Sequence, residues 1–161
     1  MIKDYLLIVD QLNKKFDEFK QLVNHEIEEI EALAKFPLTP QQESIMFYII
    51  RHQPVKAKQI ASYLNVSKSA ISQVLPKLEN QHLITREKNN ENRRESLISL
   101  GSRGEEYAQL LKSTDEMLVR KYYSKVRLEE LNNVLQTLNK LLESVKQDRE
   151  NKKEGVNHEK Q

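Results

Sequence analysis

The chain has 161 residues and a formal net charge of +2; 38% of its residues are hydrophobic, 31% are charged, and it contains three Gly and no Cys. This composition fits one mainly helical domain, or one domain with long arms, and excludes disulfides, thiol redox sensing and Cys-ligated metals. No apolar run approaches the roughly 18–20 residues of a membrane span, and charges interrupt the N-terminal segment that a signal peptide would need. We therefore expect a cytoplasmic protein that has no membrane contact.

Residues 2 to about 34 are predicted to form one long helix that lacks Gly and Pro. Its apolar side chains recur at alternating spacings of three and four, close to the heptad pattern of helices that pack along a seam. They are Ile2, Tyr5, Val9, Leu12, Phe16, Phe19, Val23, Ile27 and Ile30. Such a helix is longer than a small domain can cover, so we expect part of its seam to face another chain. Packing within the same chain is the alternative.

A second helix is predicted to begin at Pro40, because residues 36–37 (Phe-Pro) end the first. Thr39 is placed to cap this helix, and Gln42 is placed to complete a capping box with it. After the helix, residues 54–56 are expected to form a short strand that pairs with a hairpin further along the chain.

Residues 59–78 have the pattern of two helices joined by a tight turn. Asn65 tolerates the positive φ that the turn needs, and Ser67 is placed to cap the second helix. Buried stripes are expected at Ile60, Ala61, Leu64, Ile71, Val74, Leu75 and Leu78. The opposite face of the second helix carries short polar and cationic side chains, which suit phosphates and base edges in a DNA major groove. For this stretch alone, a surface hairpin without a partner is the alternative.

The next segment predicts a β-hairpin. Residues 84–86 and 96–100 have the pattern of short strands, the second with the alternation of a half-buried strand. The stretch 87–95 between them is rich in Asn and charge and contains no apolar residue. A helix-turn-helix followed by a basic-tipped hairpin is a winged helix, whose wing (about residues 84–100) lies along the DNA backbone or in the minor groove. The expected fold class is therefore mainly α with a small β-wing (α+β).

Two further amphipathic helices are predicted, from 105 to about 125 and from 128 to 145, after residues 101–104 (GSRG) break the chain. Their apolar positions outnumber what one small core needs, so we expect them to pack with the first helix into a dimerisation layer. The last residues are almost wholly polar and are expected to be disordered. The predicted organisation is a domain at 1–146, with dimerisation helices at 1–36 and 105–146 and a DNA-binding lobe at 38–104, followed by a tail at 147–161.

Charge is unevenly distributed along the chain. Residues 51–103 hold ten Lys/Arg and four Asp/Glu, a net of +6, which leaves −4 for the remainder. A basic middle favours an anionic partner, here double-stranded DNA. A protein-interaction adaptor with only non-specific DNA affinity is the competing hypothesis. An enzyme is not expected, because no phosphate-binding Gly loop, activated nucleophile or carboxylate–histidine cluster is evident.

The order of these elements resembles the MarR family of bacterial transcriptional regulators over about residues 1–146. The resemblance is carried by LTPQQ at 38–42, by QIASYLNVSKSAISQVLPKLENQHLI at 59–84, and by NRR and ISLGSRG within 92–104. It implies a homodimer, formed through the N- and C-terminal helices, that represses a roughly palindromic operator. It also implies that a small aromatic or amphipathic effector, bound between the helical layer and the lobe, releases the DNA.

Two features depart from the family pattern. Family wings usually carry Asp-x-Arg, whereas this chain has Asn92, Arg93 and Arg94. Arg94 matches the Arg that such wings send to the minor groove, but Asn92 cannot form the ion pair of the usual Asp. Pro76 removes one backbone hydrogen bond about ten residues into the second helix of the motif and can kink it.

The four histidines are widely separated and have no metal-ligand spacing, so neither a metal nor a cofactor is predicted. Some relatives are zinc sensors, and the alternative to this prediction is a site at His25 with its neighbours Glu26, Glu28 and Glu29.

The predicted DNA contacts fall into two groups. Those of the second helix of the motif are Ser67, Lys68, Ser69, Ser72, Gln73 and Lys77, and those of the wing are Arg86, Lys88, Asn92, Arg93 and Arg94. Lys68 and Lys77 are expected to bind phosphate. Base edges are expected to be read by Ser69, Ser72 and Gln73, because a Gln side chain can pair with adenine through two hydrogen bonds.

Overall fold

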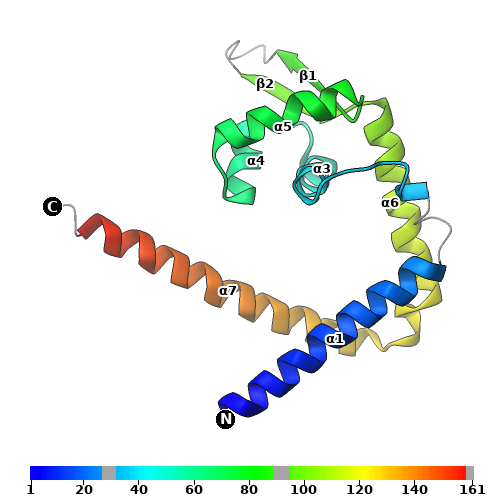
Figure 1. Cartoon of the computed structure of the whole chain (residues 1–161), viewed down its shortest axis with the longest axis vertical. Coiled ribbons are helices and arrows are strands. Elements are labelled where there is room, and N and C mark those ends of the chain that lie inside the picture. Colours follow the sequence, from blue (N-terminus) through cyan, green and yellow to red (C-terminus); the bar gives the residue numbers. More distant parts are fainter. Residues whose placement is uncertain (27–31, 89–94, 159–161) are drawn as a thin grey trace. The chain divides into compact units, whose positions relative to one another are not determined.

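The computed structural model describes residues 1–26, 32–88 and 95–158. The chain divides into two compact units, Met1–Asp115 and Glu116–Gln161. The elements are, in order, α1 (Ile2–Glu26), α3 (Pro40–His52), α4 (Ala57–Leu64), α5 (Lys68–Asn80), β1 (Ile84–Lys88), β2 (Ser96–Leu100), α6 (Ser102–Lys121), a 3-10 turn (Tyr123–Lys125) and α7 (Leu128–His158) (Figure 1). The predicted fold class, mainly helical with a small wing, is confirmed.

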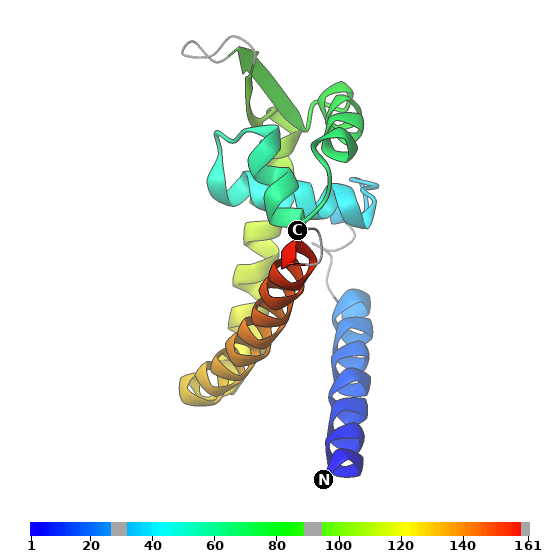
Figure 2. The same ribbon diagram turned by 90° about the vertical axis from the view of Figure 1, so that its left-hand side faces the viewer.

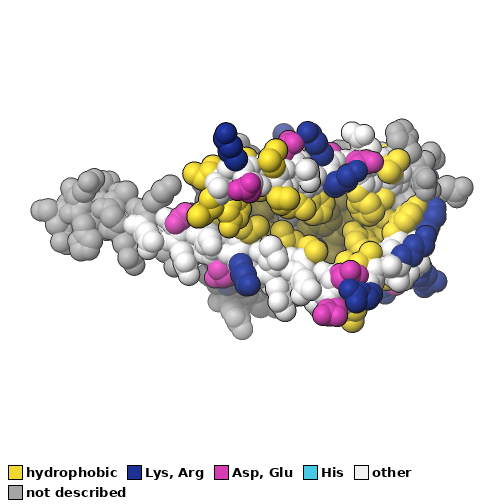
Figure 3. All heavy atoms as spheres, turned by 90° about the horizontal axis from the view of Figure 1, so that it is seen from below, with side chains coloured by type: hydrophobic (Ala, Val, Ile, Leu, Met, Phe, Trp, Pro, Cys, Tyr) yellow, Lys and Arg dark blue, Asp and Glu magenta, His cyan; other side chains and the backbone are white. Residues whose placement is uncertain are grey.

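Helix α1 carries the predicted apolar seam along its described length. Its apolar side chains from Ile2 to Leu22 are exposed, and Val23 is buried. The predicted extension to residue 34 lies partly outside the described residues. Figure 3 shows that many hydrophobic side chains of the described residues are exposed at the surface.

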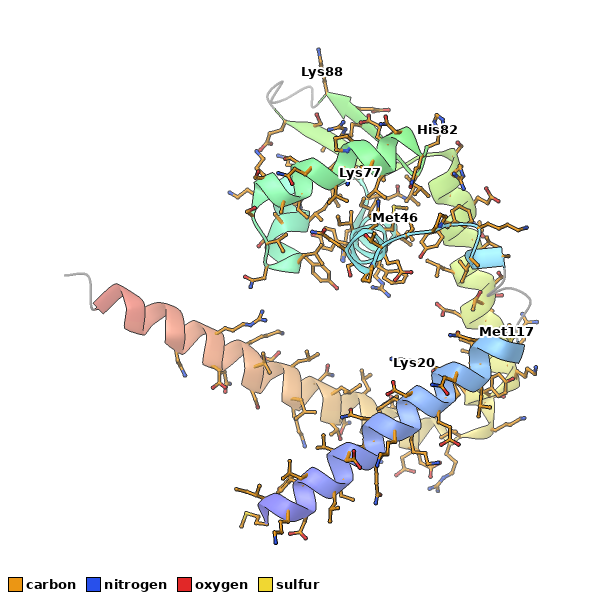
Figure 4. The ribbon with its side chains drawn as sticks, viewed as in Figure 1. Lys20, Met46, Lys77, His82, Lys88 and Met117 are labelled. Atoms are coloured by element: carbon orange, nitrogen blue, oxygen red, sulfur yellow. The ribbon has the colours of Figure 1, made fainter. Side chains whose placement is uncertain are left out.

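The start of α3 has the predicted capping box. The Thr39 hydroxyl accepts from the backbone N–H of Gln42 at 3.3 Å, and the Gln42 side chain accepts from the backbone N–H of Thr39 at 2.8 Å. Two backbone donors that helix formation leaves unpaired are thereby satisfied. The helix then buries Ile45, Met46 and Ile49 completely, and Met46 is labelled on α3 in Figure 4.

Helices α4 and α5 form the predicted helix-turn-helix. Asn65, between them, adopts the left-handed conformation with φ of 54°, and Ser67 caps α5 by accepting from the Ala70 N–H at 3.0 Å. The predicted apolar stripes are buried or partly buried in the core of this lobe. Pro76 lies inside α5, which continues through it to Asn80.

Strands β1 and β2 pair in antiparallel fashion, with Ile84 opposite Leu100, so β1 extends two residues beyond its predicted end at residue 86. The strand predicted at 54–56 is reduced to a single bridge. Val55 and Ile98 exchange two backbone hydrogen bonds, of 2.9 and 2.8 Å, which fix the wing to the start of α4.

The wing passes into α6 without the break that residues 101–104 predicted, because α6 already begins at Ser102. Gly104 is buried in its first turn, and a Cβ built there would lie 2.0 Å from the Leu83 carbonyl oxygen. Because glycine has no side chain, the first turn of α6 can pack closely against the backbone of Leu83. The prediction that these residues only separate the two elements is therefore wrong.

Tyr107 of α6 joins the lobe's core. Its ring lies 5.2 Å from that of Phe36, and the Arg103 guanidinium lies 5.1 Å from the Phe36 ring. Burial raises the pKa of Tyr107 to about 12, and the nearby Glu43 carboxylate also raises it. The phenol therefore stays neutral, and it adds a large aromatic surface to this end of the core.

The two C-terminal helices differ from their predicted bounds. Helix α6 ends at Lys121 rather than near residue 125, and a 3-10 turn covers Tyr123–Lys125. Helix α7 continues to His158, so helix replaces the disorder predicted for residues 147–158. A segment with few apolar side chains has little surface to bury, but it can still be helical, because Lys, Glu, Gln and Arg are good helix formers. Among the described residues, no helix has the length and apolar character to cross a membrane.

Candidate nucleic-acid interface

The exposed face of α5 brings together every predicted contact of this helix. Ser67, at its cap, and Lys68, Ser69, Ser72, Gln73 and Lys77, along the helix, are all exposed. The other face of the same helix buries Ile71, Leu75 and Leu78 against the core. This division fixes the rotation of α5, so its polar side chains must face solvent together.

Ser67 has a second role in this arrangement. Its hydroxyl accepts the Ala70 N–H and so stabilises the first turn of α5. An N-cap of this kind contributes roughly 0.5–2 kcal/mol to stability. Its side-chain oxygen is thus already engaged by the helix.

The wing lies beside α5, and β1 contacts that helix directly. In Figures 1 and 2 the two strands lie at one end of the lobe. Lys88 extends beyond the end of β1 (Figure 4). The predicted contacts Asn92, Arg93 and Arg94 lie outside the described residues.

Arg86 is held against helix α5. Its Nε donates to a Glu79 carboxylate oxygen at 2.7 Å, and its Nη2 contacts the same oxygen. The pair joins β1 to the C-terminal half of α5. Arg86 therefore positions the wing, a role that the sequence analysis did not assign to it.

A second ion pair joins the base of the wing to the start of α4. The Lys56 ammonium lies 2.7 Å from a Glu95 carboxylate oxygen. Its hydrogen bond and charge hold the pKa of Glu95 below its usual value, and Lys68 and Lys58 lower that pKa further. Lys56 and Lys58 were not among the residues predicted from the sequence, because residues so far from Glu95 in the chain give no local signal of their proximity to it.

The structure gives no support, among its described residues, to the alternative of a metal site near His25. Among residues 1–26, 32–88 and 95–158, no group of three or more His, Cys, Asp or Glu side chains is placed to hold a metal ion. Of the residues in that alternative, Glu28 and Glu29 lie outside the described ranges.

Fold and site together define a winged helix-turn-helix protein of the DNA-binding class. The model of the MarR family matches residues 38–96. The HTH-type transcriptional repressor MdtR of Bacillus subtilis is 26% identical over 129 residues, which cover 80% of this chain and 83% of that protein. Over residues 38–96 the chain therefore matches the MarR family of transcriptional regulators.

Several solved structures share the fold. MepR of S. aureus in complex with DNA has a TM-score of 0.59 and 22% identity, covering 82% of this chain and 96% of MepR. MepR bound to ethidium bromide has a TM-score of 0.60 and 23% identity, covering 85% and 95%. The regulator Tm0710 of Thermotoga maritima has a TM-score of 0.55 and 22% identity, covering 86% and 96%.

Proposed function

We propose that this regulator acts as a homodimeric repressor that binds a roughly palindromic operator and leaves it when an effector binds. The observation that carries the proposal is the exposed face of α5. It offers short polar side chains and two lysines beside a basic wing, while its opposite face is buried. The relative MdtR is named a transcriptional repressor, which supports repression over activation.

Each recognition helix α5 enters one major groove in this proposal. Lys68 and Lys77 bind phosphates, and Ser69, Ser72 and Gln73 meet base edges. The wing places Lys88, with Asn92, Arg93 and Arg94, along the backbone or in the minor groove. In a two-fold dimer the two half-sites are centred about 10–10.5 bp apart, or a small multiple of this distance.

The exposed apolar side chains of α1 and α7 support the dimer. On α7 they are Leu128, Val134, Leu135, Leu138, Leu141, Leu142 and Val145. Large exposed apolar surfaces are rare on monomeric proteins and usually mark an interface. A second copy of the chain supplies a matching apolar surface.

The effector is expected to be a small aromatic or amphipathic molecule. Support comes from the structure of the relative MepR with ethidium bromide. Among the described residues of this chain, no group of three or more His, Cys, Asp or Glu side chains is placed to hold a metal ion.

Transcription from a promoter that carries the bound site, with purified polymerase, tests the proposal. Repression predicts that the protein lowers transcript yield in proportion to operator occupancy, and that light scattering gives two chains per site. An increase in transcript would contradict the repressor role. Occupancy by one chain would contradict the dimer.

A further inference from the structure

A small pocket lies between the start of α4, the first turns of α5 and the base of the wing. Its volume is about 160 Å³. Its charged lining comes from Lys56, Lys58, Lys68, Arg86 and Glu95, and two serines, Ser72 and Ser96, add hydroxyl groups. Four cations and one carboxylate therefore line one small pocket between α4, α5 and the wing.

These cations are not equally available. Lys56 is paired with Glu95 at 2.7 Å, and Arg86 is paired with Glu79 of α5. Lys58 and Lys68 form no ion pair with any residue that the structure describes, and both act on Glu95 at longer range by lowering its pKa. Glu95 is thus the anion around which the three lysines are arranged.

We propose that this pocket binds one backbone phosphate of DNA. In the free protein the Glu95 carboxylate occupies the pocket and competes with that phosphate for the lysines. The inference rests on the proposed DNA-binding face. It adds Lys56 and Lys58 to the contacts made by α5 and the wing. The side chains of Lys56 and Glu95 are 40% and 30% exposed, so a phosphate can reach the pair from solvent.

The exchange is electrostatic and needs no covalent step. One phosphate oxygen accepts a hydrogen bond from the Lys56 ammonium, and a second oxygen accepts one from Lys68, which also lines the pocket. The Glu95 carboxylate turns into solvent, because it and the phosphate would repel each other at this short distance. Glu95 therefore lowers the affinity of the protein for DNA of any sequence. Binding to DNA that lacks the preferred bases stays weak as a result.

A structural tether is the competing explanation of the same ion pair. In that case Lys56 and Glu95 only hold the wing to α4, and breaking the pair would loosen the wing and weaken DNA binding. The two explanations therefore predict opposite signs for a single change, Glu95→Gln, which keeps the shape of the side chain and removes its charge.

The test measures fluorescence anisotropy of a labelled generic duplex from 50 to 200 mM salt with the full chain. Competition predicts that Glu95→Gln binds about three- to tenfold more tightly at the lower salt, with a salt slope steeper by about one unit. The matched control is Glu87→Gln, which removes the same charge from β1 outside the pocket and should change affinity less than twofold. Thermal melting confirms that both variants fold.

The double variant separates phosphate binding from general charge. Lys56→Gln should weaken binding more in the Glu95→Gln background than in the wild type, because only there is the lysine free before DNA arrives. Equal or weaker binding by Glu95→Gln, or an equal effect of Lys56→Gln in both backgrounds, would overturn the competition. If the wild type binds no DNA at 50 mM salt, the DNA-binding face itself fails, and the competitor fails with it.

Discussion

Gln73 and Lys77 lie on the same exposed face of α5, yet they are expected to contribute differently. Gln73→Ala should relax the preference for one base by roughly 1–3 kcal/mol, because it removes hydrogen bonds to a base edge. Lys77→Ala should weaken binding to all sequences alike and flatten the salt slope by about one unit, because it removes a phosphate contact. Competition binding against operators with single base changes measures both.

Each variant serves as the control for the other in that measurement. If Gln73→Ala lowered affinity equally for every operator, the residue would be a backbone contact and its base-reading role would be wrong. If Lys77→Ala changed the preferred base instead, the two assignments would have to be exchanged.

Gly104 is the residue at which one methyl group should matter most for stability. In an exposed helix a Gly→Ala change stabilises by about 1 kcal/mol, but here the new Cβ would lie 2.0 Å from the Leu83 carbonyl oxygen. We expect Gly104→Ala to lower the free energy of unfolding by roughly 1–3 kcal/mol, measured by chemical denaturation. Ser113→Ala, on the exposed surface of the same helix, is the control and should change it by less than about 0.5 kcal/mol. Stabilisation by Gly104→Ala would show that α6 does not approach Leu83 this closely.

At the scale of elements, the turn between α4 and α5 depends on the left-handed conformation of Asn65, with φ of 54°. Asn65→Ala should destabilise the lobe by about 1 kcal/mol, because the Ala side chain disfavours this conformation. Asn65→Gly should leave stability nearly unchanged, because glycine adopts positive φ readily. Urea unfolding of the pair measures the difference. Equal stability of the two variants would contradict the turn geometry.

Elements with local causes could be predicted from the sequence. The Thr39–Gln42 capping box, the Asn65 turn and the Ser67 cap each depend on residues within about four positions. The wing's anchoring could not be predicted, because Lys56 finds Glu95, and Arg86 finds Glu79, only after the chain has folded. The candidate site was therefore foreseen on α5 but not at the base of the wing.

Errors at element ends have a physical pattern. Helix α6 starts within the predicted break because Gly104 serves close packing rather than a turn. Helix α7 continues past residue 146, because polar side chains such as Lys, Glu, Gln and Arg disfavour burial but still favour helix. The contacts predicted at Asn92, Arg93 and Arg94 stay predictions, because these residues lie outside the described ranges.

At the scale of the whole molecule, the exposed apolar side chains of α7 make the homodimer testable. Leu138→Lys should convert a two-chain assembly into a single chain at micromolar concentration, because it places a charge in the proposed interface. Gln136→Lys, exposed and polar on the same helix, should leave the assembly intact. Sedimentation velocity measures the mass. A wild-type chain that sediments as a monomer would contradict the dimer and leave the seam of α1 unexplained.

The central claim is that two copies of α5 read a defined DNA sequence. The most direct measurement is selection of bound duplexes from a random pool by the purified full chain at about 150 mM salt, where purely electrostatic binding is weak. A dimer that reads sequence through α5 should recover an inverted repeat whose halves are about one helical turn, or a small multiple of it, apart. Recovery of no motif, together with binding that salt abolishes, would contradict sequence reading and favour an adaptor that binds a protein partner.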